Sequence, residues 1–388
     1  MNKTSLALLI HAAILLSSCS KGHINPTKSR IELQRYPHPK EMAEEPKDPG
    51  PAPAGTALFY STVDFANSYD WQRDTAYGTA PFTLRLHSQS GVMLELHSAG
   101  NPGLFSPSPE THHIIDGHLY TERQDIGGTV ICKDGKPAVR INAREFLKGL
   151  VEKDGHIYTL SQECFSDACL YRDNGETVAK FREAAVFGSF TDPTYPQTGA
   201  LYISGGKICF SYTARNKYYA VRDGESEEIK AGTYKYVDIK ADSGGYATLP
   251  AVREGLTIEK GGLYAGVKGY DACGIFRSGS RTFSGVIQGS RVTEIFAGEA
   301  VVYPSSSGAV AVSGLTGRIT LWSQDGKMIL EEGGRFLSPS CAAVFKGDYV
   351  LAVAPVKEGK AILVTNKERK ELDINGYVSC VSLTPPMK

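Results

Sequence analysis

The sequence GRITLWSQDGK (residues 317–327) has the pattern of a strand, a tight turn and the start of a second strand. Ile319 and Leu321 fall on one face of the first strand and Trp322 on the other, because neighbouring side chains of a strand point to opposite faces. Asp325-Gly326 is a dipeptide that favours the tight turn of a β-hairpin. The stretch predicts a hairpin with apolar side chains on both faces, as in a sheet packed between two others.

The same strand–turn–strand pattern occurs seven times along the chain. Counted from the first residue of each turn, the steps are 44, 40, 49, 55, 47 and 41 residues. Such a repeat, built from strands, is typical of a β-propeller. We therefore predict an all-β fold, a seven-bladed β-propeller; six or eight blades stay open, because Thr233–Asp242 could form another strand pair or a long loop. The turns lie at Ser90-Gly91, Asp134-Gly135, Asn174-Gly175, Asp223-Gly224, Ser278-Gly279, Asp325-Gly326 and Asn366–Glu368.

Within three of these units, short apolar runs predict the second, third and fourth strands of a blade. In the seventh unit, Ser340–Phe345 is expected to form the first strand and Asp348–Val353 the second. The runs are His118–Glu122, Thr129–Lys133 and Ala138–Ile141 in the second unit, His156–Leu160, Ala168–Arg172 and Thr177–Phe181 in the third, and Ala300–Pro304, Arg318–Ser323 and Lys327–Leu330 in the sixth.

The two ends of the repeat region are complementary. Gly376–Leu383 has the pattern of a first strand, but no blade follows it. The first unit, with strands expected at Ala57–Thr62, Phe82–Leu86 and Val92–Leu96, lacks a first strand of its own. We therefore predict that the C-terminal strand closes the first blade, which removes exposed sheet edges from the ring.

The N-terminal segment has the features of a signal peptide and predicts that the protein is exported. Lys3 precedes Leu6–Leu16, an apolar run of 11 residues that is too short to span a membrane and has the length of a signal peptide core. The run ends in Leu16-Ser17-Ser18-Cys19, which resembles a bacterial lipoprotein signal and implies lipid on Cys19. The alternative is a secretory signal peptide with an incidental cysteine. We expect a signal peptide over 1–18, a lipidated Cys19 followed by a tether to residue 55, and the propeller over 56–388.

Residues 20–55 have the composition of an unfolded tether. Prolines recur between Lys and Glu residues, and few apolar side chains are available for burial. Ile31–Tyr36 is the exception, because it could pack as a strand on the propeller. We expect the lipid on Cys19 to hold the propeller to a membrane through this tether.

The quoted hairpin (residues 317–327) resembles the third-to-fourth strand hairpin of a WD40-type blade, although the Gly-His and Trp-Asp marks of that family are absent. The combination of lipoprotein signal, Pro-rich tether and propeller resembles the propeller lipoproteins of Bacteroidetes cell envelopes. That resemblance implies a lipid-anchored protein of the bacterial envelope, at the outer membrane, on either its periplasmic or its surface side. It also implies a role in envelope binding or assembly, often with glycans.

Composition narrows the choice of partners. The 42 Lys and Arg residues balance 42 Asp and Glu residues, and no basic stripe with interleaved aromatics occurs. Nucleic acid is therefore disfavoured as a partner. We expect a monomer that needs no cofactor.

The longest departure from the blade repeat is Val63–Ala80, where aromatic side chains stand beside carboxylates and an Arg. Exposed rings and fixed charges of this kind suit a sugar or a peptide. In the alternative interpretation, Trp71 and Tyr77 fold back over the central channel. Two other long loops, Ala185–Thr198 and Ala231–Leu249, are expected on the same face. The candidate ligand-binding residues are Tyr69, Asp70, Trp71, Arg73, Asp74, Tyr77, Asp192, Tyr195 and Tyr234.

The sequence gives little support for a metal site. Asp64, Asn67, Asp70 and Asp74 lack the alternate-residue spacing of a calcium loop. Three histidines, His112, His113 and His118, could indicate zinc, but the first two point to opposite faces of a strand. We expect hydrogen-bonded histidines and no metal.

With Cys19 used for lipid, seven cysteines remain. Cys164 and Cys169 could form a disulfide across a short hairpin loop. The other five lie in apolar runs and are expected to be buried thiols, namely Cys132, Cys209, Cys273, Cys341 and Cys380.

No catalytic motif occurs in the sequence, and acids such as Asp192, Glu254 and Asp271 could meet only from different blades. Three functions stay open. The first, which we favour, is an envelope-anchored binding module for a glycan or protein. The second is a scaffold in outer-membrane assembly, and the third is a propeller glycosidase or lyase.

Overall fold

The computed structural model describes the chain from Thr56 to Pro385, with gaps. The described residues form β-strands, turns and short 3-10 segments, and among them no helix is long and apolar enough to cross a membrane. The described ranges are 56–67, 69–72, 80–100, 106–125, 127–142, 144–163, 167–173, 175–186, 201–215, 217–229, 251–252, 256–263, 272–288, 291–305, 308–315, 317–323, 325–345, 347–356 and 359–385.

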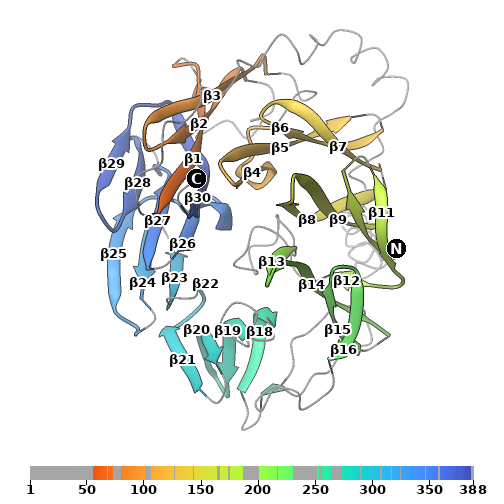
Figure 1. Ribbon diagram of the computed structural model, residues 1–388. Helices are drawn as coiled ribbons and strands as arrows, with labels where there is room; N and C mark the ends of the chain where they lie inside the picture. Colours follow the sequence, from red (N-terminus) through yellow and green to blue (C-terminus); the bar gives the residue numbers. More distant parts are fainter. Residues whose placement is uncertain are drawn as a thin grey trace, which may run out of the picture.

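Seven antiparallel sheets stand around a ring, which confirms the prediction of a seven-bladed β-propeller (Figure 1). Five of the sheets have four strands. The first blade comprises β30 (Gly376–Thr384), β1 (Ala57–Phe65), β2 (Phe82–Ser88) and β3 (Gly91–Ser98); the second β4 (His112–Ile115), β5 (His118–Asp125), β6 (Gly128–Lys133) and β7 (Lys136–Asn142); the third β8 (Glu145–Lys153), β9 (His156–Glu163), β10 (Ala168–Arg172) and β11 (Glu176–Phe181); the sixth β22 (Val301–Ser305), β23 (Gly308–Leu315), β24 (Arg318–Trp322) and β25 (Met328–Gly333); and the seventh β26 (Ala342–Phe345), β27 (Asp348–Val353), β28 (Ala361–Thr365) and β29 (Arg369–Leu372).

The C-terminal strand closes the first blade, as predicted. β30 pairs with β1 in antiparallel register from Ala57 opposite Thr384 to Asp64 opposite Gly376, with one irregularity at Ser61 and Thr62. The first strand of this blade thus comes from the end of the chain and the other three strands from its beginning.

The fourth and fifth blades depart from the four-strand pattern. In the fourth blade, β12 and β13 both pair with β14, so the place of the first strand is divided between two short segments. The fourth blade comprises β12 (Ala185–Val186), β13 (Tyr202–Ser204), β14 (Lys207–Ala214), β15 (Lys217–Arg222) and β16 (Glu225–Ile229), and the fifth comprises β17 (Ala251–Val252), β18 (Leu256–Leu263), β19 (Ala272–Ser278), β20 (Arg281–Gln288) and β21 (Arg291–Phe296).

One detail of the predicted blades is wrong, and one predicted turn has an unusual place in its blade. Ser278-Gly279 forms a hairpin turn as predicted, but it joins β19 to β20 and a further strand, β21, follows. In the sixth blade, Ala300–Pro304 matches the first strand and not the second, which is β23. The sequence of β23, GAVAVSGL, has the small residues of a loop, but Ala309 and Ala311 are fully buried and small side chains suit a strand packed between neighbouring blades.

Repeated Asp residues fix the hairpins of the second, third and fourth blades. Asp134, Asp173 and Asp223 adopt φ angles of 48° to 49°, the left-handed conformation that a type I′ turn requires and that Asp tolerates. Each carboxylate also accepts a backbone N–H from the beginning of the blade's second strand at 2.9 Å, so the two turns of a blade are joined. The donors are Leu119, Ile157 and Ile208.

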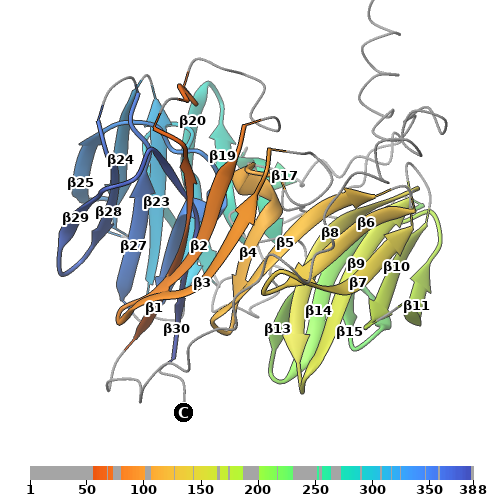
Figure 2. The same ribbon diagram turned by 90° about the horizontal axis from the view of Figure 1, so that it is seen from above.

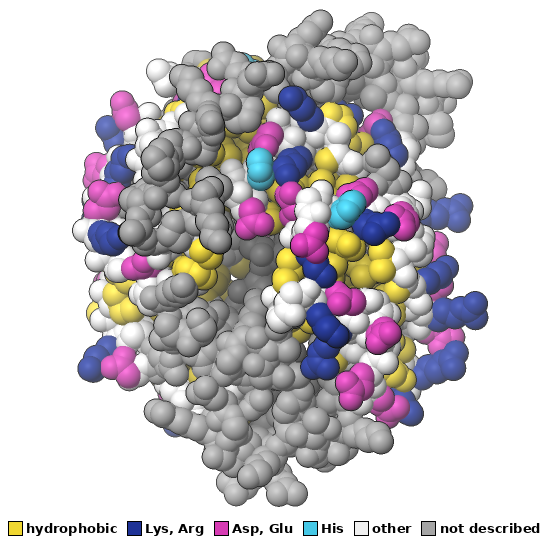
Figure 3. Space-filling model, viewed as in Figure 1, with side chains coloured by type: hydrophobic (Ala, Val, Ile, Leu, Met, Phe, Trp, Pro, Cys, Tyr) yellow, Lys and Arg dark blue, Asp and Glu magenta, His cyan; other side chains and the backbone are white. Residues whose placement is uncertain are grey.

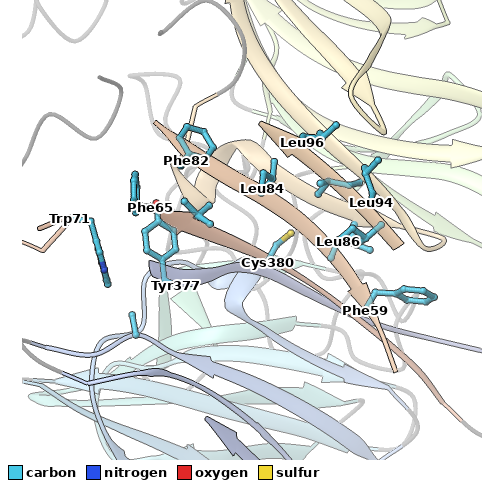
Figure 4. Packing of buried hydrophobic residues seen from close by; sticks show 14 of the residues in the cluster. Phe59, Phe65, Trp71, Phe82, Leu84, Leu86, Leu94, Leu96, Tyr377 and Cys380 are labelled. Atoms are coloured by element: carbon cyan, nitrogen blue, oxygen red, sulfur yellow. The ribbon is translucent and has the colours of Figure 1, made fainter. Parts of the chain in front are cut away.

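Both faces of the first blade are apolar, as the ring requires. On one face, Phe59, Val63 and Leu84 pack with Ile114 and Leu119 of the second blade. On the other face, the neighbouring residues of β1 and β30 pack against the seventh blade. Figure 4 shows the first of these clusters, which is built from β1, β2, β3 and β30.

The ring has two faces that differ in what they carry. We define the loop face as the one on which β1 ends and β2 begins, and the hairpin face as the opposite one, with the turns at Ser90-Gly91 and Asp134-Gly135. Because Ala57 pairs with Thr384, both ends of the propeller lie on the hairpin face. Figure 2 shows the end of β30 beside the start of β1 on one side of the ring.

Candidate functional site on the loop face

The loop that follows β1 is held at its base by one asparagine. Asn375 donates its side-chain amide to the carbonyl oxygens of Ala66 at 2.8 Å and Tyr69 at 3.0 Å. Its backbone N–H donates to Asp64 at 2.9 Å, and its carbonyl accepts from Phe65 at 2.9 Å. The beginning of the loop is therefore fixed to the segment that leads into β30.

Trp71 lies in the core of the first blade and does not present its ring to solvent. Its side chain is 3% exposed, and its ring centroid lies 4.9 Å from that of Tyr377. Figure 4 shows Trp71 facing Tyr377 at the edge of the cluster. The expectation of an exposed tryptophan is therefore wrong, because the loop turns this ring inward and packs it into the core of the first blade.

Two other predicted ligand-binding residues belong to the same loop. Tyr69 is half-buried, with its ring centroid 5.1 Å from that of Phe65. Asp70 is exposed and accepts the backbone N–H of Gln72 at 3.3 Å. The structure thus brings Tyr69, Asp70 and Trp71 together at the base of the loop. The remaining candidates, Arg73, Asp74, Tyr77, Asp192, Tyr195 and Tyr234, lie outside the described residues, as does Cys19.

Arg335 joins this site from another blade and has no counterpart among the sequence predictions. It lies on the crossover from the sixth to the seventh blade, where its backbone pairs with Ala354 through bonds of 2.7 and 3.0 Å. Its guanidinium carbon lies 5.5 Å from the centroid of the Trp71 ring, within the range of a cation–π contact. Its Nε and Nη2 atoms are buried and have no hydrogen-bond partner.

An ion-pair group flanks the loop on the first blade. Arg85 donates to Asp64 at 2.7 Å and to Glu95 at 2.5 Å. Burial disfavours the charged form of Arg85, but its hydrogen bonds to the two carboxylates outweigh that effect and raise its pKa. Asp64, which was considered above as a calcium ligand, is therefore held in an ion pair with Arg85.

The three histidines of the second blade have separate partners. His112 is fully buried with Nε2 at 2.7 Å from the Ser106 carbonyl, and burial lowers its pKa to about 3. His113 lies 3.2 Å from Glu122, and His118 lies 2.7 Å from Asp134. No group of three metal-binding side chains occurs among the described residues.

Four of the cysteines predicted to be inert thiols are buried and form no disulfide, namely Cys132, Cys209, Cys341 and Cys380. Burial raises the pKa of Cys341 to about 11 and that of Cys380 to about 12, which keeps both thiols protonated. Cys169 is also buried and free of a disulfide. Its proposed partner Cys164, and the side chain of Cys273, lie outside the described residues.

A cavity of about 390 Å³ lies on the hairpin face, where the first and seventh blades meet. Its wall combines apolar and polar side chains, which include those of Leu58, Asp348, Tyr349, Lys367 and Leu383. It lies at the start of β1, and so opposite the loop site. On the described part of the face seen in Figure 3, acidic and basic side chains alternate around the blades and form no stripe of one sign.

Solved structures resemble this fold at low sequence identity. The β-propeller domain of the Trilobed protease from Pyrococcus furiosus, described as having an open velcro topology, is 10% identical, with a TM-score of 0.43 over 86% of this chain and 99% of that one. Apo AztD from Citrobacter koseri is 11% identical, with a TM-score of 0.39 over 86% and 99%.

The uncomplexed acylaminoacyl peptidase of Pyrococcus horikoshii is 10% identical, with a TM-score of 0.42 over 86% of this chain and 53% of that one. The present chain thus spans about half the length of that peptidase. No protein-family model and no curated protein matches this chain. At these identities the similarities concern the fold alone.

Proposed function

We propose that this chain is a lipid-anchored protein of the bacterial cell envelope whose propeller binds a glycan or a protein through its loop face. The lipid is carried by Cys19 and the tether by residues 20–55. The membrane is the outer membrane, in keeping with the resemblance of the N-terminal sequence to lipoprotein signals.

The observation that carries this proposal is the position of the chain ends. The propeller begins next to Ala57, which pairs with Thr384 on the hairpin face. β1 has nine residues and crosses about 30 Å before it reaches the loop at Phe65. An attachment on the N-terminal side therefore leaves the loop face clear for a large ligand.

The charges near the loop favour binding over hydrolysis. A glycosidase needs two carboxyl groups that converge on one sugar. On the described part of the first blade, Asp64 and Glu95 are both held by Arg85. They are therefore arranged as a fixed ion-pair group and not as an acid and base pair.

The test is to measure retention and product release in the same samples, with the protein presented to a panel of polysaccharides and glycoproteins. We expect retention without products. Asp70→Ala should weaken retention at least about threefold, because Asp70 is the exposed carboxylate at the loop base. Lys367→Ala, on the opposite face, is the matched control and should bind as the native protein does.

Three outcomes would contradict the proposal. Released products would indicate a propeller glycosidase or lyase. Equal weakening by the Asp70 and Lys367 variants would remove the loop face as the binding surface. Retention of no panel member would favour a scaffold in outer-membrane assembly, which cross-linking in the envelope would then identify.

A further inference from the structure

The guanidinium of Arg335 is an unusual polar group on the described part of the loop face. Its Nε and Nη2 atoms are buried, yet neither has a hydrogen-bond partner. A buried donor without a partner is costly, and in native proteins the great majority of such groups are satisfied. Two unsatisfied donors on one cation therefore call for an acceptor that the chain's described residues do not supply.

The two donors share one edge of the guanidinium plane. Nε–H and one N–H of Nη2 point in parallel from that edge, with the spacing of the two oxygens of a carboxylate. Such a fork binds a carboxylate with two hydrogen bonds and is the reason that Arg recognises this group better than Lys. The contact with the Trp71 ring, at 5.5 Å from the guanidinium carbon, restrains the position of the fork.

The carboxylates of the described loop base are already engaged. Asp64 and Glu95 bind Arg85 at 2.7 and 2.5 Å. Asp70 accepts the backbone N–H of Gln72 at 3.3 Å. None of these three carboxylates therefore accepts a hydrogen bond from the Nε–Nη2 edge of Arg335.

An unsatisfied acceptor accompanies the two donors. Gln72 directly follows Trp71, and its Oε1 atom is buried without a hydrogen-bond partner. A group that satisfies both residues needs a carboxylate for Arg335 and a hydroxyl or N–H donor for Gln72. A sugar acid carries a carboxylate and several hydroxyl groups on one rigid ring.

We propose that Arg335 and Gln72 form a subsite for a uronic acid residue, with the sugar carboxylate on the Nε–Nη2 edge of Arg335 and a sugar hydroxyl on Gln72. This inference rests on the proposed function, because it names the ligand class of the same loop face. The protein would then be a binding protein for acidic polysaccharides.

The experiment uses galacturonate oligosaccharides and the same oligosaccharides after reduction of their carboxyl groups, each titrated calorimetrically into the protein. We expect the acidic form to bind and the reduced form to bind about tenfold to a hundredfold more weakly, as for the loss of a charged hydrogen-bonded pair. Arg335→Gln should lose the same factor for the acidic form. Arg335→Lys should lose at least tenfold, because it keeps the charge but not the fork.

Arg369→Gln is the matched control, because Arg369 lies on the outer strand of the seventh blade, where its exposed guanidinium is paired with Glu371 of the same strand and Glu332 of the sixth blade. It should bind galacturonate oligosaccharides as the native protein does. Thermal unfolding checks that each variant is folded and supplies a second readout. Galacturonate should raise the unfolding temperature of the native protein and leave that of Arg335→Gln unchanged.

The outcomes separate this inference from the proposed function. If neutral glycans or proteins are retained on the loop face, and neither carboxyl reduction nor Arg335→Gln matters, the inference is overturned and the proposed function stands. If galacturonate protects the native protein and not Arg335→Gln, but products are released from the oligosaccharides, the subsite stands and the proposed binding function gives way to a glycosidase or lyase.

Two further results would overturn the sugar assignment. Peptides that bind through a free C-terminus and not after amidation would make a peptide carboxylate the ligand. Absence of any galacturonate binding or protection would mean that the Arg335 edge holds only water.

Discussion

The hydroxyl oxygen of Ser61 lies 2.6 Å from that of Ser379, although 318 residues separate the two along the chain. Both side chains are fully buried, and Ser61 also lies 3.0 Å from the sulfur of Cys380. Three polar side chains thus satisfy one another where β1 meets β30. Buried polar groups that are fully satisfied specify one arrangement, so this contact defines the register in which the ring closes.

A substitution at Gly376 tests directly how closely β30 must approach β1. A Cβ atom at this position would lie 1.8 Å from the Val63 carbonyl oxygen, and that oxygen belongs to the backbone of β1. Gly376→Ala should therefore force the two strands apart and lower the free energy of unfolding by more than about 2 kcal/mol. Chemical denaturation monitored by circular dichroism measures the change.

Gly333→Ala is the control for this substitution, since a Cβ atom there would meet nothing within 4 Å. Its effect should stay within about 0.5 kcal/mol, as for surface substitutions in general. Equal effects of the two substitutions would show that the strand contact at Gly376 is not what limits stability.

Trp71 should stabilise the fold of the first blade. Its indole is 3% exposed and packs on Tyr377, so Trp71→Ala leaves a large cavity in the first-blade core. We expect a loss of about 3–5 kcal/mol in the free energy of unfolding. Asp70→Ala, at the exposed neighbouring position, should cost less than about 1 kcal/mol, and a native-like stability of Trp71→Ala would contradict the burial of this ring.

Asn375 should control the local stability of the loop base. Asn375→Ala removes the bonds to the carbonyls of Ala66 and Tyr69 and should weaken the loop's attachment by about 1–3 kcal/mol. Hydrogen exchange should become faster for the amide of Tyr69, which bonds to Ala66, than in the native protein. The control is Asn366→Ala on the hairpin face, where the lost partner is Asp348, and faster exchange at Tyr69 in that variant would argue against a local effect.

Acid should destabilise the fold through the half-buried His87 and the fully buried His112. Burial, with help from the nearby charges of Arg85 and Lys370, lowers the pKa of His87 to about 4, and burial lowers that of His112 to about 3. The unfolded chain takes up these protons near pH 6.5, so their contribution to stability is complete above that value and is lost as the pH falls. Between about pH 6 and 4 each histidine should contribute a slope of up to about 1.4 kcal/mol per pH unit.

Denaturation series at several pH values measure this slope. His87→Phe keeps a ring in contact with Tyr60, on which His87 stacks at 4.6 Å, but removes one titrating group. Its stability should fall less steeply with acid than that of the native protein. Parallel curves for the two proteins would mean that His87 is not the group that titrates.

The sequence predicted the ring because its signals are local and repeated. Asp-Gly turns, alternating strands and an unmatched strand at Gly376–Leu383 each follow from the chain within a few residues, and the structure confirms the closure that they imply. The error in the blades lies where a local signal misleads, because β23 has the small residues of a loop. The Ser278-Gly279 turn is confirmed, but it belongs to a blade with an extra strand.

The loop site could be predicted only in part for a related reason. The sequence shows which residues leave the blade pattern, and so it pointed to Tyr69, Asp70 and Trp71. It does not show that Trp71 turns inward, because that depends on space beside Tyr377. Arg335 was missed since its place over Trp71 follows from ring closure, which brings the crossover into the seventh blade beside the first.

The pairing of β1 with β30 also sets the order in which the ring is completed. During synthesis the first blade has only three of its strands, and the edge of β1 remains unpaired until the last part of the chain has been made. An unpaired strand edge is open to pairing with other chains during that interval. Loss of the final residues from Gly376 onward would leave the edge of β1 permanently unpaired. A short C-terminal truncation should therefore yield aggregates even though six blades remain whole.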